Sequence, residues 1–405
     1  QLKGGLGMEI KVLGSTKLGY EMTRDEILEF AGKEANICYT TRSIEDIFAE
    51  PSEKSINRAK GTLRSGHHSI ADHVRYNLGI SGIPKILAMV LNNEGVYGTS
   101  EKSARYTKMK PTPREQEKYD KWFDIFSELM EEKYLEKFAH YHERMSPGKN
   151  AHDLAKKQIT KLAQENARYM ISVFTPTIMG YSVDVRQLKY LFNWFGKFIE
   201  EAENTPFNRE LKYYMDEFRE AIREYVYIDE LKDMKERSIS LFDTREQRYE
   251  SFGEVYSINY KGTFAELAQA QRHRTLRYRM SFLLTNEFYV PRLIEENEDL
   301  KKEWLEDISS LADVYPQGML VMINERGTYE DFMQKCSERL CGCAQLEIAL
   351  QTQEIAKRYV NAVKDKYPEI YEALLPYSTK ARCQINWRCD RPCVWGAKDA
   401  FTRLC

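Results

Sequence analysis

Two sequence patterns occur twice in this chain, in the same order, and this repetition constrains the fold more than any other feature. Residues 76–95 read YNLGISGIPKILAMVLNNEG and residues 256–274 read YSINYKGTFAELAQAQRHR, each with a strand pattern that continues into an apolar helix. Further along, residues 167–195 and 311–339 each contain a short extended apolar run with a proline, then a polar turn and a helix. Internal similarity of this kind indicates that one structural unit is present in two copies.

We therefore expect an α+β protein made of two tandem domains, each an antiparallel sheet packed with long helices. A chain of 405 residues is long enough for two domains of about 200 residues. The expected boundary follows a long helix and gives domains of residues 8–226 and 227–405, the second with a cysteine-rich tail. The first domain carries an additional charged helical stretch at about residues 115–150, with apolar side chains at helical spacing.

Charge and hydropathy exclude several classes of protein. The formal net charge of −2 argues against a nucleic-acid-binding protein, which usually has a basic excess. No window approaches the roughly 18 apolar residues that a membrane span needs, and no signal-peptide pattern opens the chain. We therefore expect a cytoplasmic protein with reduced thiols, without a membrane or nucleic-acid partner.

The cysteines near the C-terminus leave two interpretations open. Cys383, Cys389 and Cys393 have the spacing C-x5-C-x3-C, and Cys341 and Cys343 could add ligands. Standard zinc sites use pairs with the spacing C-x2-4-C, which are missing here, so packing of the tail is favoured over a bound metal or cluster. No cysteine lies in a recognisable nucleophile motif, and we predict no metal site.

The most unusual local feature is the triplet Arg272-His273-Arg274, which follows a largely apolar helix. Guanidinium groups near apolar surface need anionic or hydrogen-bonding partners. A solvated basic helix face is the simple alternative. Because the triplet is contiguous, it favours a site for the phosphates of a flavin or nucleotide.

At these residues the chain resembles the flavin-dependent thymidylate synthases, whose hallmark is Arg-His-Arg, seven residues and then Ser. HHSIADH (67–73) resembles the family's H-x-[S/T]-P-x-E-H segment, and EFYVP (287–291) resembles its E-F-Y-I-P run. RLCGCAQLEI (339–348) resembles the family's R-x4-A-Q-W-E-I helix and is the most specific match. The resemblance covers most of residues 8–376 and implies two domains like the thymidylate synthase complementing proteins.

The two halves differ in which parts of the hallmark they retain. The second half has the Arg-His-Arg triplet, but only six residues separate it from Ser281, and the Ser-x-Arg-Tyr arm is missing. The first half keeps that arm at 103–106 and has Asn-Glu-Gly at 93–95 in place of the triplet.

Two further arginines are divided in the same way. The second half has Ala312 at the position of Arg168, and the first half has Phe195 at the position of Arg339. In the family, four identical subunits share their active sites. The resemblance therefore implies a homodimer that forms a pseudo-tetramer, in which each site combines both halves.

The implied activity is C5 methylation of dUMP to dTMP, with FAD as cofactor and methylenetetrahydrofolate and NADPH as co-substrates. C5 methyl or hydroxymethyl transfer to another pyrimidine nucleotide, such as UMP or dCMP, is the enzymatic alternative. A nucleotide- or flavin-binding descendant without turnover is the alternative from another class of protein.

The resemblance also implies a role for each retained residue. Arg339 would be catalytic, because it would hold the uracil ring as its N3-deprotonated anion. The nucleotide would be bound by Glu101, Ser103, Arg105, Arg168 and Gln269. The flavin would be bound by His67, Ser69, Asp72, Arg272, His273 and Arg274.

Overall fold

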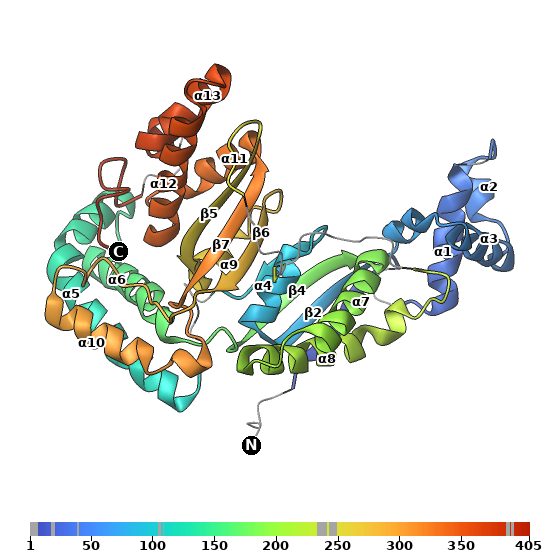
Figure 1. The fold of residues 1–405 in the computed structure, drawn as a ribbon, viewed down its shortest axis with the longest axis horizontal. Coiled ribbons are helices and arrows are strands. Elements are labelled where there is room, and N and C mark those ends of the chain that lie inside the picture. Colours follow the sequence, from blue (N-terminus) through green and yellow to red (C-terminus); the bar gives the residue numbers. More distant parts are fainter. Residues whose placement is uncertain are drawn as a thin grey trace. The chain divides into compact units, whose positions relative to one another are not determined.

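The computed structural model describes residues 7–17, 21–38, 40–103, 107, 109–232, 241–242, 249–385, 389 and 393–405. They form helices and antiparallel sheets, so the predicted α+β class is confirmed (Figure 1). The chain divides into two compact units, which we describe separately. Unit 1 comprises residues 1–102 and 176–238, and unit 2 comprises residues 103–175 and 239–405.

Unit 1 is built around a sheet with the strand order β1-β2-β4-β3, in which every pair is antiparallel. Along β2, Tyr76, Leu78 and Ile80 are buried and alternate with more exposed residues, as expected for a sheet with one face on the core. Helices α7 and α8 pack against each other beside this sheet (Figure 1). The elements are β1 (Glu9–Ser15), α1 (Arg24–Ile37), α2 (Ile44–Phe48), α3 (Ser52–Arg64), the 3-10 helix η1 (His68–His73), β2 (Arg75–Pro84), α4 (Lys85–Asn93), β3 (Gly98–Glu101), β4 (Pro176–Asp184), α7 (Val185–Glu201) and α8 (Pro206–Val226).

A bulge interrupts the pairing of β2 with β4 between Ser81 and Ile83. Gly82 lies at this point with a φ of +76°, a backbone conformation that side chains with a Cβ atom rarely adopt. The glycine therefore permits the bulge that ends the regular part of the strand.

Unit 2 contains a second antiparallel sheet, with the strand order β5-β7-β6. On β5, Tyr256, Ile258 and Tyr260 are buried at alternate positions. The elements are α5 (Pro113–Met145), α6 (Ala151–Ala167), η2 (Arg168–Met170), β5 (Val255–Thr263), α9 (Phe264–Ala270), β6 (Arg277–Phe282), α10 (Glu298–Ser309), η3 (Ala312–Val314), β7 (Leu320–Thr328), α11 (Tyr329–Arg339), α12 (Leu346–Val363), α13 (Pro368–Thr379) and η4 (Arg382–Gln384).

The two sheets share one arrangement of strands and helices. In unit 1 the order β2-β4-β3 places the last of the three strands in the middle, and β5-β7-β6 does the same in unit 2. The first strand runs directly into α4 or α9, and the middle strand runs directly into α7 or α11. The side chains of Asp184 and Thr328 cap the N-termini of α7 and α11.

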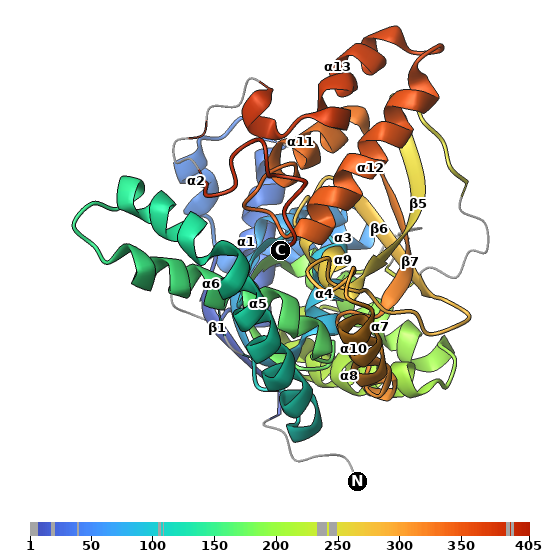
Figure 2. The same ribbon diagram turned by 90° about the vertical axis from the view of Figure 1, so that its left-hand side faces the viewer.

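The grouping of residues 103–175 with unit 2 differs from the sequence-based division at residue 226. Helices α5 and α6 lie side by side (Figure 2), and the buried face of α5 also packs on α10. The Trp122 ring lies 5.0 Å from that of Trp304, and its Nε1 donates to Asp307 Oδ2 at 3.0 Å. The apolar face of α5 thus packs on α6 and also on residues of the second half of the chain, and its local pattern did not reveal the latter.

None of the helices in the described part of the chain combines the length and the apolar character that crossing a bilayer requires.

Candidate functional site

Arg339 is the last residue of α11 and contacts two groups at the end of α9. Its Nε donates to His273 Nε2 at 2.9 Å, and its Nη2 donates to the backbone oxygen of Gln269 at 3.3 Å. The helix dipole favours a cation at this end of α11. Because the guanidinium is planar, two bonds from different nitrogens fix its orientation. The side chain remains partly exposed, so a ligand can reach it.

Gln345, the residue before α12, connects two of the predicted site residues. Its Oε1 accepts hydrogen bonds from Arg168 Nη2 and from Gln269 Nε2. Its Nε2 donates to the hydroxyl of Tyr169. Arg168 and Gln345 are both buried, so these bonds are not weakened by competition with water. The Gln345 amide therefore joins Arg168 and Gln269, and Arg339 reaches the same group through the backbone oxygen of Gln269.

A second layer of contacts supports this amide. The hydroxyl of Tyr169 donates to Glu347 Oε2 at 2.6 Å. Glu347 also accepts from the backbone nitrogen of Thr263 at 3.1 Å and from its hydroxyl at 2.9 Å. Burial raises the pKa of Glu347, and the bonds from Tyr169 and Thr263 oppose that rise. These contacts tie η2, α12 and the β5–α9 junction into one rigid layer.

His273 is neutral in this arrangement. Burial, together with the positive charges of Arg339 and Lys335, lowers its pKa to about 2. The ring then carries its proton on Nδ1, because Nε2 accepts the bond from Arg339. Glu338 Oε2 lies 3.7 Å from Nδ1, and with a neutral ring this is a polar contact and not an ion pair.

Beneath the triplet lies a cluster of buried charged groups from α9, β7 and α11. The ammonium of Lys335 lies 2.6 Å from Glu325 Oε2, and both side chains are fully buried. Glu325 also accepts from the hydroxyls of Tyr256 at 2.7 Å and Tyr260 at 3.1 Å. Glu266 is fully buried nearby, and burial raises its pKa to about 8, although the charge of Lys335 opposes the rise.

Glu266 makes the stability of the protein depend on pH. Its folded-state pKa lies above its usual value of 4.5, so its contribution is fully present below about pH 4.5 and is lost as the pH rises towards 8. In that window, we expect the titration of Glu266 to lower the free energy of unfolding by about 1.4 kcal/mol for each unit by which the pH rises. The neutral variant Glu266→Gln should lack this slope in denaturant titrations between pH 5 and pH 8.

The control for this prediction is Glu306→Gln, which changes an exposed carboxylate on α10. It should leave the pH dependence of the wild type intact. Equal slopes for Glu266→Gln and the wild type would show that Glu266 does not titrate in this range.

The other predicted flavin ligands of the triplet are placed differently from His273. Arg272 and Arg274 are exposed and flank the buried imidazole. The backbone turns sharply here, with the His273 nitrogen donating to the Ala270 oxygen at 3.0 Å. Because of this turn, the side chains of Arg272 and Arg274 are exposed, whereas the ring of His273 is buried.

Unit 1 holds four of the remaining predicted residues. His67 and Ser69 are exposed, and Asp72 of η1 lies 3.2 Å from Arg186 Nη1. Glu101, at the end of β3, lies 2.6 Å from the ammonium of Lys85. These contacts hold Asp72 and Glu101 within unit 1.

Only part of the predicted phosphate arm belongs to the residues that the structure describes. The backbone oxygen of Ser103 accepts from Thr107 nitrogen at 3.0 Å and from its hydroxyl at 2.7 Å. Arg105 lies outside the described residues.

Sequence reasoning missed the side chains that join this network. Gln345 and Glu347 belong to the same 339–348 segment that supplied Arg339, so the signal was present there. Tyr169 follows Arg168 directly. No local pattern marks Lys335, Glu325 or Glu266, because their proximity arises only from the packing of α9 and α11 on the sheet.

Comparison with known proteins gives two sequence matches. Residues 20–198 match the family model described as thymidylate synthase complementing protein. A flavin-dependent thymidylate synthase from Clostridium tetani is 26% identical over 196 residues, which make up 46% of this chain and 74% of that protein. The family match ends before the Arg-His-Arg triplet and Arg339.

Solved structures show only a distant likeness. Thymidylate synthase X from Helicobacter pylori, crystallised with FAD and dUMP, is 16% identical with a TM-score of 0.27, over 55% of this chain and 100% of that one. The UMP/dUMP methylase PolB from Streptomyces cacaoi, bound with 5-Br dUMP, is 14% identical with a TM-score of 0.30, over 55% of this chain and 97% of that one. The two sequence matches thus show that residues 20–198 of this chain are similar to the thymidylate synthase complementing proteins and to a flavin-dependent thymidylate synthase.

Proposed function

We propose that this chain is an FAD-dependent pyrimidine-nucleotide C5 methyltransferase that converts dUMP to dTMP, with methylenetetrahydrofolate as carbon donor and NADPH as reductant. The observation that carries the proposal is the network in which Gln345 joins Arg168 and Gln269, while Arg339 donates to Gln269. The family resemblance assigns these residues to the nucleotide and its base. Their convergence supports a common site for them.

We also infer that the two units are diverged copies of one domain. The shared strand order and the shared strand-to-helix junctions support this. The copies would divide the site, with Glu101, Ser103 and Arg105 of the first copy holding the nucleotide. His67, Ser69 and Asp72 would contact the flavin, and a homodimer would supply the pseudo-tetramer in which both sets meet.

The residues present fit these ligands. Arg272 and Arg274 are two exposed cations on one turn, an arrangement suited to the phosphates of a flavin dinucleotide. Gln269 Oε1 is buried and accepts no hydrogen bond from the described residues. A buried acceptor of this kind is costly unless a partner reaches it, and a donor on a bound base would be such a partner.

A bound flavin would supply hydride transfer, and the protein would supply position and charge. Arg339 would stabilise the N3-deprotonated uracil, because its guanidinium is permanently charged and offers a rigid donor fork. His273 would act as a positioning residue, since its neutral Nε2 holds Arg339 Nε. Arg168, which Gln345 holds by a hydrogen bond, would provide a second positive charge for the nucleotide.

The cofactor part of the proposal is tested by flavin retention. A purified wild-type protein should be yellow, and the double variant Arg272→Ala, Arg274→Ala should lose its flavin. Each charge-assisted contact contributes about 1.5–3 kcal/mol, so the loss of two should weaken binding by roughly two orders of magnitude or more. Fluorescence titration with FAD measures the change.

The matched control is Lys302→Ala with Lys357→Ala, which removes two positive charges from exposed positions of α10 and α12 in the same unit. It should retain flavin as the wild type does. Equal affinity of both double variants for FAD would place the flavin elsewhere.

The reaction itself is tested with dUMP labelled at C5, methylenetetrahydrofolate and NADPH. Formation of dTMP with release of the C5 label is the expected result. Running UMP and dCMP in parallel identifies a changed substrate. Flavin binding without label release from any of the three nucleotides would support the non-catalytic alternative.

A further inference from the structure

Three cysteine thiols of unit 2 contact one another, although they come from two distant segments. Cys341 and Cys343 lie between α11 and α12, and Cys393 lies in the C-terminal segment. The thiol of Cys343 forms hydrogen bonds with both Cys341 and Cys393. None of the three is in a disulfide bond, and we call them the thiol trio.

The backbone of the trio permits this close approach. The Cys343 nitrogen lies 3.4 Å from Cys341 Sγ. Between these residues is Gly342, where an added Cβ atom would lie 3.1 Å from Cys393 Sγ and 2.9 Å from Trp395 Cβ. Glycine therefore leaves the space into which the Cys393 sulfur packs.

The surroundings favour a thiolate within the trio. The hydrogen bond from Cys343 lowers the pKa of Cys341 to about 5 and that of Cys393 to about 6. The positive charge of Arg403 also favours the thiolate of Cys341, and Arg403 donates to the Ala344 oxygen at 2.7 Å. Because Cys343 carries only one hydrogen, it stabilises one thiolate at a time, so Cys341 and Cys393 share a single negative charge.

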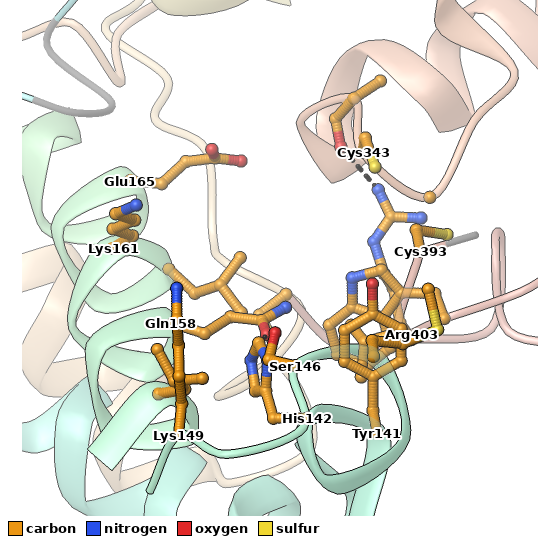
Figure 3. A pocket seen from close by; sticks show the side chains of 18 residues that line it. Tyr141, His142, Ser146, Lys149, Gln158, Lys161, Glu165, Cys343, Cys393 and Arg403 are labelled. Atoms are coloured by element: carbon orange, nitrogen blue, oxygen red, sulfur yellow. Dashed lines mark hydrogen bonds between the residues drawn. The ribbon is translucent and has the colours of Figure 1, made fainter. Parts of the chain in front are cut away.

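A cavity of about 560 Å³ gives small molecules access to Cys343 and Cys393. Cys343 and Cys393 line one side of it, and Lys149 and Lys161 line another (Figure 3). Cys343 is exposed and Cys393 is half-buried. Glu165 also lines the cavity, but Lys149, Lys161 and Arg403 outnumber this one carboxylate, so the lining favours a small molecule with carboxylate groups.

We propose that Cys343 and Cys393 form a redox-active dithiol site that reacts with small, carboxylate-bearing disulfides and closes to a Cys343–Cys393 disulfide. In the first step the Cys393 thiolate attacks one sulfur of glutathione disulfide, giving a mixed disulfide and one glutathione thiolate. The Cys343 thiol then loses its proton to that thiolate and attacks the Cys393 sulfur, releasing the second glutathione. Two protein thiols are oxidised to one disulfide, and one glutathione disulfide is reduced to two thiols.

Metal binding is the competing use of clustered thiols. Within the described ranges, no group of three or more His, Cys, Asp or Glu side chains is arranged to hold a metal ion. The hydrogen bonds run from Cys341 through Cys343 to Cys393, an arrangement that suits exchange between neighbouring sulfurs. The geometry therefore suits redox chemistry, and metal binding is an outcome that the experiment below distinguishes.

Formation of the disulfide would affect the candidate functional site. Cys343 lies between Arg339 and Gln345 in the chain, and both of these residues belong to the network described above. A covalent link from this segment to the C-terminal segment would restrict the connection between α11 and α12. This consequence does not depend on which nucleotide the protein binds.

The test uses the reduced, full-length wild-type protein, incubated with glutathione disulfide and analysed by intact mass and peptide mapping. We expect a product that has lost two hydrogens and yields a cross-linked peptide containing Cys343 and Cys393. Because the negative charge shared by Cys341 and Cys393 is already present above their lowered pKa values, the rate should be nearly constant between pH 7 and pH 8.5. An ordinary thiol would react about tenfold faster per pH unit below its pKa.

Two variants complete the experiment. Cys393→Ser should abolish the cross-link, whereas Cys38→Ser, at an exposed position of unit 1, should form it at the wild-type rate. Cross-links spread over other cysteine pairs, or a rate that climbs tenfold per pH unit, would overturn the proposal. So would stoichiometric zinc in the purified protein with thiols that react only after chelation, which would identify a metal site instead.

Discussion

Arg339→Ala is expected to reduce turnover of dUMP by about 10²–10³-fold while leaving nucleotide affinity largely unchanged. Under the proposed function, the guanidinium interacts most strongly when negative charge develops on the uracil ring, so its loss raises the barrier more than it weakens binding. The alanine side chain cannot form the two bonds that orient Arg339, which run to His273 and to the Gln269 oxygen. Release of label from C5 of dUMP measures turnover, and equilibrium titration measures affinity.

Two further variants make this result specific. Arg339→Lys keeps the charge without the planar fork, so it should recover only a small part of the lost activity. Arg144→Ala removes an exposed arginine near the end of α5 and should behave as the wild type. Undiminished C5 exchange in Arg339→Ala would remove Arg339 from the proposed site.

Lys335→Met is expected to destabilise the protein by about 3–5 kcal/mol, because it leaves the carboxylate of Glu325 buried without its ion-pair partner. The two groups lie 2.6 Å apart with no exposed surface, so water cannot replace the lost contact. Glu325 would keep its bonds from Tyr256 and Tyr260, which compensate only part of the charge. Denaturant titration at constant pH measures the change in the free energy of unfolding.

The double variant Lys335→Met, Glu325→Gln separates this explanation from a simple packing defect. Removing the unpaired charge should restore much of the lost stability, since neutral replacements of buried ion pairs are often well tolerated. Lys302→Met, at an exposed position of α10, should change stability by no more than about 0.5 kcal/mol. A loss in the double variant as large as in Lys335→Met would mean that the charge of Glu325 is not the cause.

The segment 339–348 is the part of the candidate site that the sequence indicated most clearly, because one short stretch contains several residues of the hydrogen-bond network. The segment 339–348 contains Arg339, Gln345 and Glu347, and all three take part in the hydrogen-bond network. Arg168 was predicted from its own short motif, and the structure shows it bonded to Gln345, 177 residues later in the chain. The sequence predicted a role for Arg168 but did not predict its partner.

The inward orientation of His273 could not be predicted from the sequence. The triplet suggested three equivalent ligands for a flavin, whereas the structure separates one buried, neutral ring from two exposed arginines. The tight turn after α9 produces this separation, and the charges of Arg339 and Lys335 help to determine the protonation state. The turn is local, whereas the two charges come from α11, which is distant in the sequence.

Local sequence patterns predicted the α+β class and the strands that continue into helices at 76–95 and 256–274. The alternation of apolar residues in 76–95 and 256–274, and the helices that follow, reflect interactions between residues close together in the chain, which local periodicity records. Tertiary structure alone decided that α5 and α6 belong to unit 2, that Lys335 pairs with Glu325, and that Cys343 meets Cys393. The physical reason is that an apolar face or a charged group selects its partner by the shape and charge of a distant surface, and a local pattern specifies the need for a partner without specifying which one.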